Sequence, residues 1–207
     1  MTILTKPLTS RQQQAEIRRS QILEMALRLF ALHGFNGVST KTLAQELGIA
    51  EGLIFHYFAT KEDLLNAIIE TRHSFFGDLT RILAQSKGLP AAEVLPGLAR
   101  DWLATLRREA AITSVLFAEA QTNARVGEAL QRLIENGVGR LAAYLDTRIT
   151  AGELRPDLPL KTSAQMFFSS LMIFFVAHRN LPDAQWELQV AQFVEEMVSL
   201  WTQGAHT

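Results

Sequence analysis

Apolar residues recur along most of the chain at the 3.6-residue spacing of amphipathic helices. The first such stripe consists of Ile22, Leu23, Ala26, Leu29 and Phe30. It predicts a helix that ends at Gly34, because glycine ends helices readily. Similar stripes follow to the end of the chain, so the sequence predicts an all-α protein of about nine helices.

Residues 40–57 have the spacing of two short helices joined by a tight turn. Leu43 and Ala44 fall on one face of the first helix, and Ile54 in the second returns to the same core. Gly48 lies between them, where a left-handed residue can end a helix without a Cβ penalty. This arrangement is typical of a helix-turn-helix, whose second helix enters a DNA major groove about 12 Å wide. The alternative is an ordinary helical hairpin that binds no nucleic acid.

The residues around this pair predict where the neighbouring helices begin. Ser39 or Thr40 can cap the first helix of the pair by accepting a hydrogen bond from a backbone N–H. Thr60 can cap a following helix, whose first turn carries Glu62 and Asp63 at the positive end of the helix dipole. We therefore expect a compact three-helix unit from which a fourth helix leaves.

Residues 22–69 resemble the N-terminal domain of the TetR family of bacterial transcriptional regulators. The resemblance depends on Gly-Phe at 34–35, Leu-Gly-Ile-Ala at 47–50, Tyr-Phe at 57–58 and Lys-Glu-Asp-Leu-Leu at 61–65. It implies a homodimer with an N-terminal helix-turn-helix domain and a helical C-terminal domain that binds a small-molecule effector and releases a double-stranded DNA operator. The corresponding divisions are a disordered arm at 1–14, the helix-turn-helix domain at 15–70, and an effector-binding and dimerisation domain at 71–207.

The resemblance also assigns DNA contacts by position, and residue chemistry adds to them. The predicted DNA-binding residues are Thr40, Lys41, Gly52, Leu53, His56, Tyr57 and Lys61. Gly52 lets the backbone approach the groove, and Leu53 can contact a thymine methyl group. Two residues depart from the family pattern. Glu51 stands where a basic or polar residue is frequent and would repel phosphate, and Phe55 lacks the hydroxyl of the usual tyrosine.

The charge distribution favours a nucleic-acid partner at the N-terminal end. The whole chain has a net charge of −1, but residues 1–61 hold seven basic and four acidic residues, a surplus of three. Phosphate binding needs positive potential at the binding surface rather than over the whole protein.

The segment from Leu160 to Arg179 is apolar on two helical faces, which predicts two neighbours for that helix. One neighbour would be its own domain and the other a symmetry mate in a four-helix bundle. The family implies a dimer contact on this helix and on the preceding helix. The predicted dimer residues are Gly137, Val138, Leu141, Phe168, Met172 and Phe175. The alternative is a buried helix of a monomer.

Aromatic residues of the middle helices are candidates for the walls of an effector pocket, with a few polar side chains to orient the ligand. The predicted ligand-binding residues are Phe76, Trp102, Phe117, Gln121, Phe174 and His178. Their apolar bias favours a hydrophobic or amphipathic effector, and the alternative is that they form plain core.

Other features exclude function classes. The chain has no cysteine, no apolar run as long as a membrane span, and no signal-peptide core in its first residues, which suits a cytoplasmic protein without membrane contact. It has no phosphate-binding glycine loop, metal-ligand spacing or nucleophile elbow, so we expect neither an enzyme nor a cofactor. The remaining alternative is a helical carrier or protein-interaction module that does not bind DNA.

Overall fold

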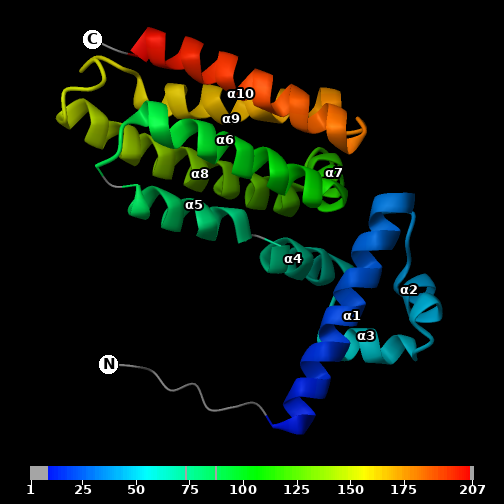
Figure 1. Ribbon diagram of the computed structural model, residues 1–207. Helices are drawn as coiled ribbons and strands as arrows, with labels where there is room; N and C mark the ends of the chain where they lie inside the picture. The colour runs from blue at the N-terminus through cyan, green and yellow to red at the C-terminus, as the bar shows by residue number, and fades with distance from the viewer. Residues whose placement is uncertain (1–8, 73, 87, 206–207) are drawn as a thin grey trace. The chain divides into compact units, whose positions relative to one another are not determined.

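The computed structural model describes residues 9–72, 74–86 and 88–205, with side chains except at 70–78 and 205. Within these residues the chain is built of α-helices, which confirms the all-α prediction (Figure 1). The helices are α1 Ser10–His33, α2 Thr40–Leu47, α3 Glu51–Tyr57, α4 Lys61–Arg72, α5 Ser74–Gln85, α6 Ala91–Arg108, α7 Ala110–Glu119, α8 Ala124–Thr150, α9 Leu160–His178 and α10 Asp183–Ala205.

Contacts between residues divide the chain into two compact units. The first contains Met1–Arg72 and Ala111–Val126, and the second contains His73–Ala110 and Gly127–Thr207. The sequence predicted residues 111–126 in the C-terminal domain, whereas the contacts group them with the first unit.

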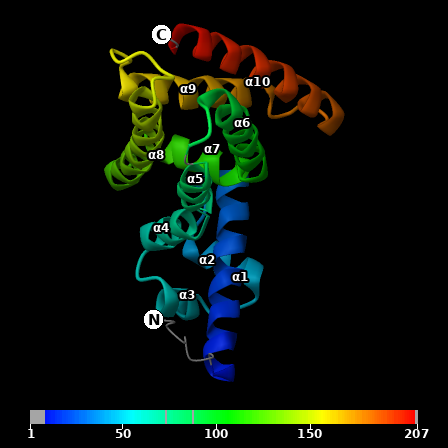
Figure 2. The same ribbon diagram turned by 60° about the vertical axis from the view of Figure 1, so that its left-hand side comes forward.

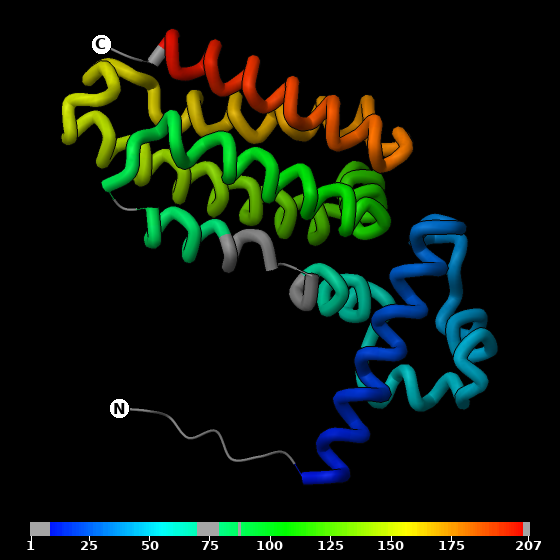
Figure 3. The backbone as a smooth tube through the Cα atoms, in the orientation of Figure 1, coloured from blue at the N-terminus to red at the C-terminus, as the bar shows by residue number. Residues whose placement is uncertain are grey.

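The first unit is organised around α1, which packs against both α2 and α4 (Figure 2). Its predicted stripe is buried, with Ile22 and Phe30 fully enclosed together with Leu43, Ile54 and Leu64 from the other helices. The path of the backbone from α1 through the short α2 and α3 into α4 can be followed in Figure 3. The apolar spacing in the sequence therefore identified the core of this unit.

The start of α1 differs from the sequence prediction. Residues 10–14 were expected in a disordered arm, but they form the first turn and a half of the helix. Thr9 and Gln12 form a capping box, in which the Thr9 hydroxyl accepts from the Gln12 N–H and the Gln12 side chain accepts from the Thr9 N–H at 2.9 Å. This cap satisfies backbone groups that are otherwise left without partners at a helix start.

The second unit has one apolar core, with α6 packed against α5, α9 and α10. The α9 residues Phe167, Leu171 and Phe175 are buried in this core together with Leu141 of α8. By length and composition α9 is also apolar enough to span a membrane. A third of this apolar stretch is buried within the unit, and Met166, Ile173 and Val176 are exposed.

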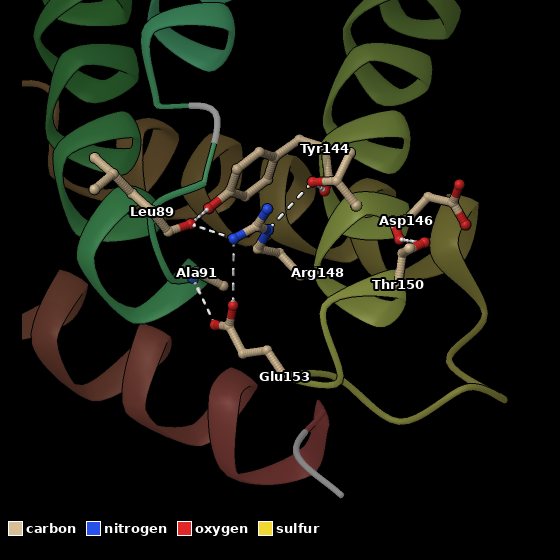
Figure 4. A network of polar contacts seen from close by, with 8 residues as sticks. Leu89, Ala91, Tyr144, Asp146, Arg148, Thr150 and Glu153 are labelled. Carbon is tan, nitrogen blue, oxygen red and sulfur yellow. Dashed lines mark hydrogen bonds and ion pairs between the residues drawn. The ribbon is translucent and has the colours of Figure 1, made fainter.

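A buried polar network joins the segment before α6 to the end of α8 (Figure 4). The Tyr144 hydroxyl and the Arg148 guanidinium both donate to the Leu89 carbonyl, at 2.9 and 3.1 Å. The Glu153 carboxylate accepts from the Ala91 N–H at 2.6 Å and lies 4.0 Å from the guanidinium. A buried charge is tolerated when it is paired and hydrogen-bonded, as Arg148 is here.

Candidate nucleic-acid interface

The turn between α2 and α3 fixes the direction of α3. Gly48 has φ 63°, a left-handed conformation that favours glycine, and its N–H donates to the Gln45 carbonyl at 3.1 Å. The Ile49 N–H donates to the Ala44 carbonyl at 3.0 Å, which completes the helix end. The short turn and the buried Ile54 hold α3 against the core, as the sequence predicted for a helix-turn-helix.

One face of α3 is open to solvent. Phe55 is 48% exposed, and Gly52 and His56 are also exposed. Leu53 and Tyr57 are half-buried beside that face. A Cβ built on Gly52 would meet no atom within 4 Å, so the fold itself does not require glycine at this position. The missing side chain leaves room for an outside partner to approach the α3 backbone.

Thr40 and Glu51 join the beginnings of the two helices. The Thr40 hydroxyl donates to the Glu51 carboxylate at 2.6 Å, across eleven positions of sequence. Ser39 is the N-cap of α2 and accepts from the Thr42 N–H at 3.0 Å. The N–H groups of Thr40 and Lys41 therefore lie in the first turn, where a helix offers no internal acceptor.

The structure gives Lys61 contacts that the sequence did not reveal. Its ammonium group donates to the carbonyls of Phe35 and Val38, at 2.9 and 3.1 Å, and lies 4.1 Å from the centroid of the Phe35 ring. Lys61 thus braces the loop between α1 and α2. An ammonium has three donors, so these two bonds leave one for a phosphate.

The start of α4 is capped as predicted. The Thr60 hydroxyl accepts from the Asp63 N–H at 3.0 Å, and the Asp63 carboxylate accepts from the Thr60 N–H at 3.1 Å. This reciprocal cap fixes the position of Lys61 next to it.

The predicted DNA-binding residues all lie in the first unit, but their surroundings differ. Lys41, Gly52 and His56 are exposed, and the rest are half-buried. The exposed Phe55 was not among the contacts predicted from the sequence. The sequence held one signal for this contact: Phe55 is apolar, but helical spacing does not place it on the buried face of Ile54.

Of the predicted effector residues, the structure brings Phe174 and His178 into contact. Phe174 and His178 stack at 4.4 Å and line a groove of about 620 Å³ between α9 and α10. Trp102 lies in the same unit but contacts Phe168, with ring centroids 5.5 Å apart. Phe117 and Gln121 belong to the first unit, and the side chain of Phe76 lies outside the described residues.

The predicted dimer residues differ in their burial. Leu141 and Phe175 are 0% and 1% exposed in the core of their own unit, so neither is available to a second chain. Gly137 is also buried. Val138, Phe168 and Met172 are partly buried and pack against the same core. The exposed apolar side chains of α9 and α10 are instead Met166, Ile173, Val176, Leu188 and Leu200.

Comparison with known proteins identifies the family. The profile described as "Bacterial regulatory proteins, tetR family" matches residues 22–68. The transcriptional repressor AcnR of Corynebacterium diphtheriae is 32% identical over 152 residues, which cover 71% of this chain and 73% of AcnR.

Solved structures share the fold. A TetR-family regulator from Mesorhizobium loti matches 93% of this chain and 98% of its own, with TM-score 0.75 and 16% identity. The regulator FadR from Bacillus subtilis, solved in complex with stearoyl-CoA, matches 90% of this chain and 99% of its own, with TM-score 0.71 and 21% identity. Together with the helix-turn-helix geometry, these matches show that the chain belongs to the TetR family of bacterial DNA-binding transcriptional regulators.

Proposed function

We propose that this regulator is a cytoplasmic repressor that binds a palindromic operator as a homodimer and releases it when a small hydrophobic or amphipathic effector binds. The observation that carries the proposal is the open face of α3, where exposed residues surround a glycine that the fold does not need. The repressor activity of AcnR, as its name states it, supports the sign of regulation.

The α3 face provides the base-reading contacts in this proposal. Gly52 lets the helix backbone come close to the base edges, and Leu53 and Phe55 offer apolar contact to thymine methyl groups. His56 and Tyr57 supply polar groups at the same end of the helix. Because few of these side chains donate hydrogen bonds to base edges, recognition depends partly on DNA shape.

Phosphate contacts come from the start of α2 and from its flank. The Thr40 hydroxyl is held by Glu51, so its backbone N–H rather than its hydroxyl is the donor for a phosphate. Lys41 is exposed beside it, and the third ammonium donor of Lys61 completes the set.

The exposed apolar face of α9 and α10 is the proposed dimer surface. It differs from the set of residues predicted from the sequence, and its Ile173 lines the groove that contains Phe174 and His178. Pairing this face with its copy removes large exposed apolar side chains from water. A twofold dimer presents two copies of α3 to successive major grooves, about 34–36 Å apart.

The effector site is proposed for the interior of the second unit. Phe174 and His178 border the proposed dimer face, which leaves Trp102 and its neighbour Phe168 as the aromatic pair for an effector. The FadR structure was solved with stearoyl-CoA bound, which supports an effector with an apolar tail. Effector binding would favour a dimer state in which the two copies of α3 are spaced wrongly for DNA.

Fluorescence anisotropy with a labelled duplex tests the DNA-binding site. We expect log K of the wild type to fall linearly with log salt, and the His56→Ala/Tyr57→Phe variant to bind more weakly. His33→Ala is the matched control. His33 is also exposed in the first unit, but it is the last residue of α1, at the opposite end from the Thr9 cap. Equal binding by both variants would refute the site, and salt-independent binding by the wild type would refute DNA binding through phosphates.

A further inference from the structure

The N-terminal half of α1 carries a polar stripe that the proposed site does not use. Arg11, Gln14, Arg18 and Gln21 are spaced by three, four and three positions, so they share one face of the helix. The capping box at Thr9 and Gln12 makes this segment helical, which fixes where Arg11 lies relative to the rest of the stripe. We call these four residues the α1 stripe.

The α1 stripe borders α3, the recognition helix of the proposed DNA interface. Its residues line a groove of about 450 Å³ that also includes Leu53 and Tyr57 of α3. Arg11, Gln14 and Gln21 are exposed, and no ion pair within the described residues holds either arginine of the stripe. The stripe therefore offers guanidinium and amide donors next to the tyrosine proposed to contact DNA.

The charge of this groove differs from that of a second groove along α1, between α1 and α2. No acidic residue lines the groove beside α3. The groove between α1 and α2, of about 840 Å³, is lined by Glu16, Glu24 and Glu46 together with Arg18 and Arg28. Arg18 and Gln21 line both grooves, whereas Arg11 and Gln14 line only the groove beside α3. The lining of the groove beside α3 holds two arginines and no acid, whereas three glutamates outnumber two arginines in the other groove, so an anionic ligand favours the groove beside α3.

Arg19 lies on the same helix but has a different role from the two arginines of the stripe. Its guanidinium lies 5.3 Å from the centroid of the Phe58 ring, within the first unit. Arg19 is thus used in packing, whereas Arg11 and Arg18 face the groove.

We infer that the α1 stripe binds phosphates of the DNA backbone next to the base pairs contacted by α3. The inference rests on the proposed function and adds a rigid helical contact, in place of the disordered arm, to the DNA interface. Arg11 and Arg18 bind phosphate oxygens, and the two glutamines donate further hydrogen bonds from the same face. Such contacts raise affinity and fix the position of α3 without reading sequence.

The test uses the full-length protein and a labelled 30-base-pair duplex of random sequence, with affinity measured by anisotropy over a series of KCl concentrations. The variant is Arg11→Gln, and the matched control is Arg28→Gln on the same helix, where Arg28 lines the groove with the three glutamates. Circular dichroism establishes that both variants have the wild-type helix content. Glutamine already occupies two positions of the stripe, so it suits the helix.

We expect the slope of log K against log salt to become less steep in Arg11→Gln, by about 0.9 for each phosphate that is no longer bound, or about 1.8 for a dimer. Affinity should fall with it, while Arg28→Gln keeps the wild-type slope. Equal slopes for Arg11→Gln and Arg28→Gln would overturn the inference and leave the proposed function standing. A wild-type protein without salt-dependent binding would overturn the proposed function and the inference together.

Discussion

The hydroxyl of Thr40 and the carboxylate of Glu51 meet at 2.6 Å, which ties the first residue of α2 to the first residue of α3. From the sequence, Glu51 was a departure that would repel phosphate. In the structure it is also a brace that sets the start of the recognition helix. A hydrogen bond to a charged group contributes about 1.5–3 kcal/mol, so the brace can offset some of that repulsion.

The two roles of Glu51 predict different effects for two substitutions. Glu51→Gln keeps an oxygen acceptor for Thr40 but removes the charge, so we expect DNA affinity to rise by about two- to tenfold at moderate salt. Glu51→Ala removes the charge and the brace, so we expect a smaller rise or a loss. Anisotropy on the same duplex measures both.

Lower affinity in Glu51→Gln than in the wild type would contradict the repulsive role. Identical affinity and identical thermal stability of Glu51→Gln and Glu51→Ala would contradict the bracing role.

Lys61 is predicted to stabilise the first unit whether or not it contacts DNA. Lys61→Ala removes two hydrogen bonds from the carbonyls of Phe35 and Val38, and we expect a loss of about 1–3 kcal/mol in the free energy of unfolding. Urea unfolding followed by circular dichroism measures it, with the exposed Lys41→Ala as control. A denaturation midpoint of Lys61→Ala equal to that of Lys41→Ala would mean that the brace contributes nothing.

Tyr144 predicts a loss of stability at high pH. Burial, partly offset by the nearby Arg148 charge, raises the pKa of Tyr144 to about 12. A tyrosine in the unfolded chain ionises near pH 10, so between about pH 10 and 12 the unfolded state binds fewer protons than the folded state. The stabilising contribution linked to the raised pKa of Tyr144 is complete below pH 10. As the pH rises from about 10 to 12, the free energy of unfolding falls by about 1.4 kcal/mol per pH unit at most.

Tyr144→Phe should lack that part of the decline, because its side chain does not titrate. Urea unfolding of both proteins at pH 9 and pH 11.5 makes the comparison. The same decline in the variant as in the wild type would show that Tyr144 ionises normally in the folded protein.

The proposed dimer surface predicts that a charge on α9 separates the subunits. Ile173 is 70% exposed in the groove, and Ile173→Glu would place a carboxylate in the interface. We expect sedimentation velocity to show a monomer at concentrations where the wild type is dimeric. Leu32→Glu is the control, because Leu32 is 66% exposed but belongs to the first unit. A dimeric Ile173→Glu protein would exclude this face.

The sequence predicted local features of the fold well because they depend on neighbouring residues. The Gly48 turn, the Ser39 cap and the Thr60 cap follow from residue chemistry within three or four positions. The start of α1 at Ser10 was missed because residues 10–14 are polar and have no apolar period, although Thr9 and Gln12 have capping-box spacing.

The candidate site was less predictable because its contacts join distant positions. The bonds from Lys61 cross 26 and 23 residues, and no local pattern indicates them. The apolar faces of α9 could not be assigned to the core or to a partner from spacing alone. Phe175 is buried in its own unit, whereas Ile173, two positions earlier, is exposed.

In vitro selection from a library of random duplexes tests the central claim, that exposed α3 faces of a dimer read DNA sequence. Purified protein is bound to the library, and the recovered DNA is sequenced over successive rounds. We predict enrichment of two inverted half-sites with centres about 10 base pairs apart or a multiple of that spacing, and loss of the enrichment in His56→Ala/Tyr57→Phe. A recovered pool that remains random with the wild-type protein would contradict the account.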